Sequence, residues 1–96
     1  MQLDVPAHAT ADWHADDDRG LIDAARSDPQ AFVTLYQRHY QPIASYLFRR
    51  TADRHATEDL VSDVFLQAMR RLGMFRWTGI PLRFWLLRIA TNAANR

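Results

Sequence analysis

The chain has 96 residues, of which 48% are hydrophobic, and it carries twelve basic side chains, eleven acids and no cysteine. This length fits one domain, and the apolar content is enough for a packed globule and too high for a wholly disordered chain. The lack of cysteine excludes disulfides and thiolate zinc sites. No apolar run reaches the ~18–20 residues that span a bilayer, and no basic-then-apolar signal pattern opens the chain, so we expect a cytoplasmic protein without a membrane partner.

The charges are unevenly distributed along the chain. All eleven acids precede residue 64, together with six arginines, whereas residues 64–96 carry six arginines and no acid. The two parts therefore have charges of −5 and +6, which give the net charge of +1. This pattern predicts two different partners, one of them a polyanion, with chance clustering on a solvated surface as the alternative. Every basic side chain is arginine, which favours forked contacts with phosphate and base edges.

The first sixteen residues show no periodicity. We expect a disordered tail over 1–16, because termini stay disordered unless something ties them down, and one domain over 17–96. The tail holds four side chains of types that bind metals, namely His8, Asp12, His14 and Asp16. Nothing fixes their geometry, so we predict no metal site.

Two helices are predicted next. The first is short, is capped by Asp17 or Asp18 and ends near Ser27. Its narrow apolar side consists of Leu21, Ile22, Ala24 and Ala25. Asp28 before Pro29 is typical of an N-cap and a first helical position, and an amphipathic helix of about twenty residues follows. Its apolar stripe consists of Phe32, Leu35, Tyr36, His39, Ile43, Tyr46 and Leu47.

Pro42 lies inside the stripe of this second helix. Proline lacks one backbone donor, but the apolar spacing continues beyond it, so we expect a kink and not a break.

A third helix begins at Asp53 or Thr57. Its predicted core stripe consists of Leu60, Val61, Val64, Phe65, Ala68, Met69 and Leu72. The opposite face is acidic at its start and basic at its end, as the helix dipole favours. Gly73 is predicted to end this helix in the left-handed conformation.

A loop over 73–80 leads to a last helix that Pro81 opens. One face of this helix is apolar and consists of Leu82, Trp85, Leu86, Ile89 and Ala93. Another face carries Arg88, Thr91, Asn92 and Asn95. No strand-like alternation persists, so the predicted fold class is all-α, with three main helices and a short N-terminal one in a compact bundle.

Enzyme signatures are missing from the sequence. It has no Gly-rich phosphate loop, nucleophile elbow or His-Glu metal helix. His39 and His55 have no carboxylate at a spacing that would orient an imidazole, and His39 is expected to be a core-edge side chain. Glu58 and Asp59 point about a quarter-turn apart and are not a carboxylate pair. We therefore expect a protein that is not an enzyme and uses no cofactor.

The last helix and the loop before it have a chemistry that suits nucleic acid. Arginine binds phosphate and guanine edges, while asparagine and threonine can hydrogen-bond base edges. Aromatic side chains in a loop can stack on or enclose an unpaired base. Helical proteins with one basic face are common, so this chemistry alone is only suggestive.

Three motifs in order make the interpretation more specific. They are AFVTLYQRHYQPIASYLFRR (31–50), ATEDLVSDVFLQAMRRL (56–72) and PLRFWLLRIATNAANR (81–96). Together they resemble region 2 of the extracytoplasmic-function (ECF) sigma factors of bacterial RNA polymerase, over about residues 18–96. The resemblance implies a helical domain that binds core RNA polymerase and recognises and melts the promoter −10 element. Full sigma factors of this group also carry a second helical domain that reads the upstream promoter element, and we expect that domain to be absent from these 96 residues.

The resemblance implies one surface for polymerase. The helix over 56–72 would dock against the clamp coiled-coil of the largest polymerase subunit. The matching positions are Glu58, Asp59, Leu60, Ser62 and Asp63. Ser62 stands where many relatives have glutamine, so one polar contact is weaker or replaced. Phe65 and Leu66 match the aromatic–aliphatic pair that follows, and Phe65 is expected in the core.

It also implies a surface for promoter DNA. The loop over 73–80 falls where such proteins capture a base flipped from the non-template strand, and the last helix matches the one that melts and reads the −10 element. The candidate DNA contacts are Phe75, Arg76, Trp77, Arg83, Arg88, Thr91, Asn92, Asn95 and Arg96. The three loop residues are expected to be exposed, although a loop aromatic can equally tuck under the domain. An anti-sigma factor is a further candidate partner.

Two alternatives stay open. A helical protein-interaction module could keep this fold and not read DNA. A duplex-binding repressor of the helix-turn-helix type is disfavoured, because no short turn joins two compact helices ahead of a recognition helix.

Overall fold

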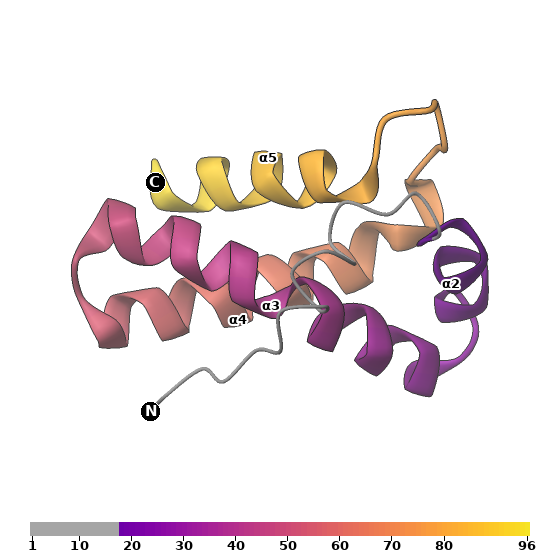
Figure 1. Ribbon diagram of the computed structural model, residues 1–96, viewed down its shortest axis with the longest axis horizontal. Helices are drawn as coiled ribbons and strands as arrows, with labels where there is room; N and C mark the ends of the chain where they lie inside the picture. Colours follow the sequence, from indigo (N-terminus) through magenta and orange to yellow (C-terminus); the bar gives the residue numbers. More distant parts are fainter. Residues whose placement is uncertain (1–17) are drawn as a thin grey trace.

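The computed structural model describes residues 18–96, and every regular element in this range is a helix. The elements are α2 (Asp18–Ala25), α3 (Pro29–Thr51), α4 (Arg54–Arg71), the 3₁₀ turn η1 (Leu72–Met74) and α5 (Leu82–Ala94). Helices α3 and α5 run in the same direction, α4 runs antiparallel to both, and α2 lies beside the start of α3 (Figure 1). The all-α prediction is confirmed, whereas the expectations for residues 1–16 and the cap at Asp17 lie outside the described residues.

Aspartates begin both long helices. The Asp28 side chain accepts a hydrogen bond of 3.0 Å from the Gln30 amide, with Pro29 in the first helical position. The Asp53 side chain accepts one of 3.0 Å from the Ala56 amide. Such caps satisfy backbone donors that have no partner inside the helix. Both predicted starts are confirmed, with Asp53 and not Thr57 as the cap of α4.

The corner between α3 and α4 depends on a left-handed residue that is not glycine. Helix α3 continues through Pro42 to Thr51, so the predicted absence of a break is confirmed and the kink stays a prediction. Ala52 then adopts φ 52° and ψ 27°, and its amide donates to the Phe48 carbonyl at 2.8 Å. This conformation reverses the chain within two residues and brings α4 back along α3.

The prediction for Gly73 is wrong. Gly73 lies inside η1 and is not among the positive-φ residues of the described range, where the only such glycine is Gly79, at φ 89°. Helix α4 ends through the tighter 3₁₀ turn at Leu72, and the Phe75 amide closes this turn on the Leu72 carbonyl at 3.1 Å. The sharp change of direction that needs glycine comes later, at the far side of the loop.

One core joins all four helices. Its buried apolar side chains are Ile22, Leu35, Ile43, Ala44, Leu47, Val61, Val64, Phe65, Ala68, Leu72, Phe75, Leu82, Leu86, Ile89, Ala90 and Ala93. The predicted stripes of α3 and α5 lie in or against this core. In α4 the stripe is narrower than predicted, because Met69 is 52% exposed. Within the described range, no helix combines the length and apolar content that crossing a membrane would require.

Candidate nucleic-acid interface

Helix α5 presents two polar side chains at helical spacing on its outer face. Arg88 and Asn92 are exposed, one turn apart, while Leu86, Ile89 and Ala93 face the core. The apolar stripe therefore fixes how α5 is rotated, and this rotation points Arg88 and Asn92 to solvent. Both remain available for a ligand, as the sequence predicts.

Thr91 in α5 and Asn95, the residue that caps its end, hold α5 against α3. Tyr46 and Thr91 share a hydrogen bond of 2.7 Å between their hydroxyls. Arg50 donates to the Tyr46 hydroxyl at 2.9 Å and also to the Asn95 side-chain oxygen. The hydrogen bond with Thr91 lowers the pKa of Tyr46, and the hydrogen bond and charge of Arg50 lower it further. Partial burial of the hydroxyl acts in the opposite direction but does not outweigh them. These two DNA-contact candidates thus have a positioning role in the structure.

Arg83 and Arg96 lie at opposite ends of α5. The half-buried Arg83 places its guanidinium 4.8 Å from the centre of the Phe84 ring. Arg96 forms an ion pair with Asp63 of α4. A candidate DNA contact is therefore joined directly to a candidate polymerase contact.

The loop between η1 and α5 is partly folded into the core. Phe75 is only 7% exposed and meets the rings of Trp85 and Trp77 edge-on, at centroid distances of 5.1 and 6.2 Å. Trp77 is half-buried, and Arg76 is exposed. The expectation that all three are exposed is wrong for Phe75, because its ring completes the packing around Trp85.

A pocket of about 530 Å³ opens between this loop and the first turns of α5. Its wall consists of Met74, Phe75, Arg76, Thr78, Ile80, Pro81, Phe84, Trp85 and Arg88. The apolar side chains of Met74, Ile80 and Phe84 are largely exposed at this pocket. Exposed apolar groups beside two arginines are suited to enclosing an unpaired base and holding its phosphate.

Sequence reasoning missed these three apolar side chains as site residues. The available signal was Phe84, which stands four residues before Arg88 and therefore on the same helix face, away from the predicted apolar stripe.

Helix α4 carries the acidic candidates. Glu58, Asp59 and Ser62 are exposed, and Leu60 is half-buried against the core. Asp63 is half-buried and accepts a hydrogen bond of 2.9 Å from Gln67 in addition to its ion pair with Arg96. The structure thus brings the five predicted positions onto adjoining turns of one helix.

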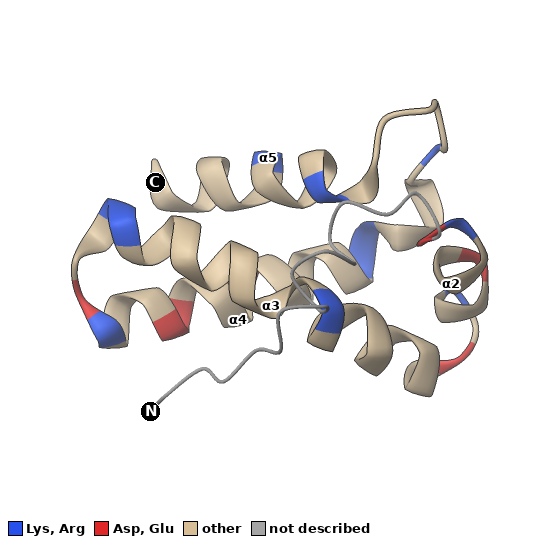
Figure 2. Cartoon of the chain, in the orientation of Figure 1, with Lys and Arg blue, Asp and Glu red and all other residues tan. Residues whose placement is uncertain are grey.

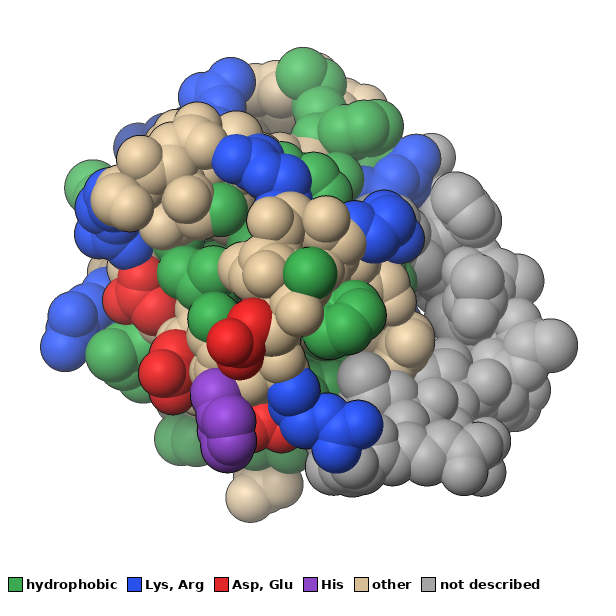
Figure 3. Space-filling view, turned by 90° about the vertical axis from the view of Figure 1, so that its left-hand side faces the viewer, with side chains coloured by type: hydrophobic (Ala, Val, Ile, Leu, Met, Phe, Trp, Pro, Cys, Tyr) green, Lys and Arg blue, Asp and Glu red, His purple; other side chains and the backbone are tan. Residues whose placement is uncertain are grey.

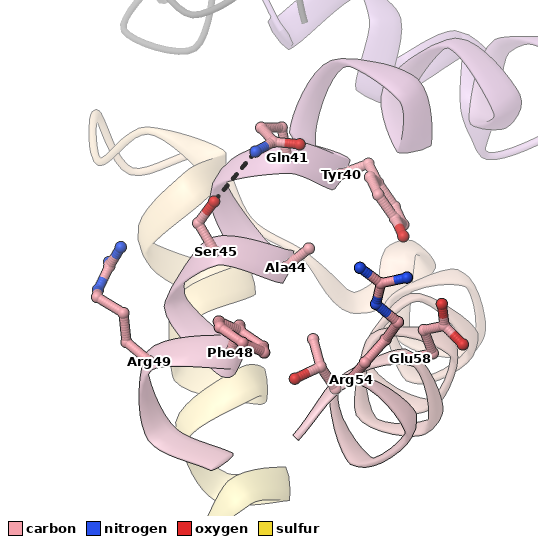
Figure 4. A pocket seen from close by; sticks show the side chains of 9 residues that line it. Tyr40, Gln41, Ala44, Ser45, Phe48, Arg49, Arg54 and Glu58 are labelled. Atoms are coloured by element: carbon pink, nitrogen blue, oxygen red, sulfur yellow. Dashed lines mark hydrogen bonds between the residues drawn. The ribbon is translucent and has the colours of Figure 1, made fainter. Parts of the chain in front are cut away.

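A groove of about 370 Å³ separates this part of α4 from the second half of α3 (Figure 4). Its wall consists of Tyr40, Gln41, Ala44, Ser45, Phe48, Arg49, Arg54, Thr57 and Glu58. Arg54 extends along the groove toward Tyr40, with Glu58 beside it (Figure 4). Burial, and then the charges of Tyr36 and Glu58, raise the pKa of Tyr40. Glu58, one of the acidic candidates, and the exposed Phe48 thus line the same groove.

Acids and arginines are only partly separated on the surface. Acids cluster at the start of α4 and around α2 (Figure 2). Arginines lie on α5 and its preceding loop, but also on α2, on α3 and at both ends of α4 (Figure 2). At the end of the molecule where α5 finishes, however, red side chains are surrounded by blue ones (Figure 3). The Asp63–Arg96 pair agrees with this view. The segregation along the chain is therefore incomplete in three dimensions.

The expectation that His39 has no carboxylate partner is wrong, because Asp18 hydrogen-bonds to it. Asp18 is 3% exposed, and its carboxylate accepts hydrogen bonds from His39 Nε2 at 2.8 Å and Arg38 Nη1 at 2.9 Å. Burial alone would raise the pKa of Asp18, but the hydrogen bonds and charges of His39 and Arg38 together lower it. His39 is buried, as expected, but it does have a carboxylate partner, from a helix 21 residues earlier. No group of three metal-binding side chains occurs within residues 18–96.

Comparison with known proteins decides the family. The family model described as sigma-70 region 2 matches residues 35–96. The chain belongs to the sigma-70 region 2 family. This confirms the resemblance to region 2 of ECF sigma factors, and it does not favour the interaction-module alternative. The matched range contains most of α3 together with α4, the loop and α5, whereas α2 precedes it.

Several sigma factors are similar to this sigma-70 region 2 domain. ECF RNA polymerase sigma factor BldN of Streptomyces coelicolor is 34% identical over 73 residues, which are 75% of this chain and 28% of that protein. RNA polymerase sigma factor YlaC of Bacillus subtilis is 43% identical over 56 residues, 58% of this chain and 32% of that protein. RNA polymerase sigma-H factor of Pseudomonas aeruginosa is 32% identical over 79 residues, which are 81% of this chain and 40% of that protein.

The chain thus spans between about a quarter and two fifths of the length of these relatives. No solved structure is significantly similar to the chain.

Proposed function

We propose that this chain is a non-catalytic module that binds core RNA polymerase and recognises and melts the promoter −10 element in the cytoplasm. The observation that carries the proposal is the sigma-70 region 2 match over residues 35–96, which includes the acidic helix α4 and the loop–α5 unit. In this proposal polymerase makes the RNA, and the chain supplies docking and DNA recognition. An anti-sigma factor as a further partner stays a prediction.

Polymerase docking is assigned to α4. Glu58, Asp59 and Ser62 are exposed on successive turns, which suits a contact with a basic or polar helix surface. We assign the clamp coiled-coil of the largest polymerase subunit as the partner. Leu60 and Asp63 complete the contact from the edge of this face.

DNA reading is assigned to the outer face of α5 and the pocket of about 530 Å³ beside it, which we call the base pocket. Pulling a base out of a duplex costs a few kcal/mol, and stacking in a pocket recovers ~1–3 kcal/mol per base. Arg88 lines the pocket and can hold a phosphate, and Asn92 one turn later can read a base edge. The energy balance favours a base that is already unpaired, since the cost of flipping then disappears.

This balance gives the test of the proposal. The chain should bind a single-stranded oligonucleotide that carries a non-template −10 element more tightly than the matching duplex in a fluorescence anisotropy titration. Arg88→Ala combined with Asn92→Ala should weaken single-strand binding by more than about tenfold, since the variant loses a phosphate contact as well as a base-edge contact, and the base-edge contact alone is worth ~1–3 kcal/mol.

Arg54→Ala is the matched control, because Arg54 is also an exposed arginine but lies at the start of α4, away from the base pocket. Equal affinity of the wild-type chain for single strand and duplex would contradict the proposal, as would equal binding by the double variant and the control.

A further inference from the structure

Helix α2 is attached to the loop by one arginine. Arg26 Nη2 donates to the Phe75 carbonyl at 2.7 Å, and Arg26 Nε donates to the Leu72 carbonyl at 3.3 Å. The remaining terminal nitrogen pairs with Asp23 at 3.1 Å. A guanidinium that spans two carbonyls in this way fixes the start of the loop against α2. Helix α2 therefore lies directly beside the start of the loop.

A pocket of about 280 Å³ lies at this junction between α2 and the loop. Its wall consists of Arg19, Ile22, Asp23, Arg26, Phe75, Arg76 and Trp77. The wall thus holds three arginines and one carboxylate, and that carboxylate is already paired with Arg26. The Arg19 guanidinium lies 5.4 Å from the centre of the Trp77 ring, a cation–π arrangement that keeps it over the pocket wall. This junction pocket has the charge and the forked donors that an anionic oxygen group requires.

The junction pocket adjoins the base pocket. Phe75 and Arg76 line both of them, so the two hollows share one wall. A nucleotide whose base enters one hollow carries a phosphate on either side of its sugar. The neighbouring cluster of arginines is therefore within reach of the same strand.

We propose that the junction pocket binds a backbone phosphate of the single-stranded DNA whose base occupies the base pocket. Arg19 and Arg76 supply the contacts, and Arg26 is a positioning residue because its donors are held by the loop carbonyls and Asp23. This inference rests on the proposed function and adds α2, which lies before the residues matched by the family, to the DNA-binding surface. The occupant is a DNA phosphate, since the aromatic base pocket continues directly from the site.

The test measures the salt dependence of DNA binding. Wild type, Arg19→Ala, Arg19→Lys and Arg54→Ala are titrated with a fluorescent single-stranded oligonucleotide of randomised sequence at several salt concentrations. Each lost phosphate contact to a single strand lowers the slope of log affinity against log salt by about 0.7. We expect this decrease for Arg19→Ala, and a slope close to wild type for Arg19→Lys, which keeps the charge, and for the control Arg54→Ala.

The outcomes separate this inference from the proposed function. If wild type prefers single strand but Arg19→Ala keeps the slope of Arg54→Ala, the junction pocket is not a phosphate site, whereas the proposed function stands. If the slope of log affinity against log salt decreases equally for Arg19→Ala and Arg19→Lys, the effect is structural and the inference is overturned. Failure of the wild-type chain to prefer single strand contradicts the proposed function itself. Circular dichroism melting of each variant checks that the helices are intact.

Discussion

At the scale of single residues, the buried carboxylate of Asp18 connects α2 to α3 through His39 and Arg38. A charged group removed from water is costly unless hydrogen bonds and an opposite charge compensate, and here both are present. Because Asp18 is the first residue of α2, this contact fixes the beginning of the helix that also borders the loop.

The first prediction concerns the stability contributed by this carboxylate. Asp18→Asn should lower the free energy of unfolding by about 1.5–3 kcal/mol at pH 7, because hydrogen bonds to a charged group are weakened. The folded-state pKa of Asp18 lies below its ordinary value of 3.8, so its contribution is fully present above about pH 4 and is lost as the pH falls through the folded-state pKa. The difference between wild type and variant should therefore shrink in acid.

Urea denaturation at pH 7 and at lower pH measures this difference. Asp23→Asn is the control on the same helix, since Asp23 is exposed and forms only a surface ion pair, worth less than about 1 kcal/mol. A difference between wild type and Asp18→Asn that stayed constant from pH 7 into acid would show that the carboxylate charge does not contribute.

At the scale of elements, the corner at Ala52 and the packing of α5 decide where the functional side chains lie. The left-handed Ala52 sends α4 back along α3, and this return places the acidic start of α4 beside the end of α3. The hydrogen bonds from Tyr46 and Arg50 then hold α5 on the same pair of helices. The two candidate surfaces are thus fixed by one corner and one interhelical network.

The second prediction concerns this corner. Ala52→Gly should raise the free energy of unfolding by about 0.5–1 kcal/mol, because glycine adopts the left-handed conformation without the clash that a Cβ atom causes. The same substitution inside α4, Ala56→Gly, should lower it by about 0.5–1 kcal/mol, since glycine is unfavourable in a helix. Thermal melts of the two variants should therefore shift in opposite directions from wild type. A decrease for both would mean that Ala52 is not strained.

The elements themselves could be read largely from the sequence. Caps at Asp28 and Asp53 and stripes at spacings of three and four are local signals, and they gave the helices and most of the core. The left-handed Ala52 and the Asp18–His39 pair were not predicted, and the prediction for Gly73 was wrong. Alanine carries no mark of a left-handed residue, and the contact between Asp18 and His39 depends on how two helices pack. Which loop aromatic is buried also depended on packing, because Phe75 and Trp77 have similar apolar character.

At the scale of the whole molecule, the proposed polymerase surface lies on α4, and the proposed surface for melted DNA lies on the loop, α5 and α2. The assignment of residues to these partners came from the family resemblance and the charge pattern, and it remains a proposal. The structure shows that the helices carrying the two sets share one hydrophobic core and that the sets meet at the Asp63–Arg96 ion pair. Away from that pair, Asp59 on α4 and Arg88 with Asn92 on α5 are exposed on different helices. Each surface should therefore be removable without loss of the other.

The measurement that tests this most directly uses Asp59→Arg, which reverses one exposed charge on α4. We expect this variant to lose co-purification with core RNA polymerase, while its affinity for single-stranded DNA and its helical content stay as in wild type. Ser27→Arg, an exposed site just after α2, adds the same positive side chain elsewhere and should leave polymerase binding intact. Retained binding of polymerase by Asp59→Arg, or equal loss of polymerase and DNA binding, would contradict the account of two separate surfaces.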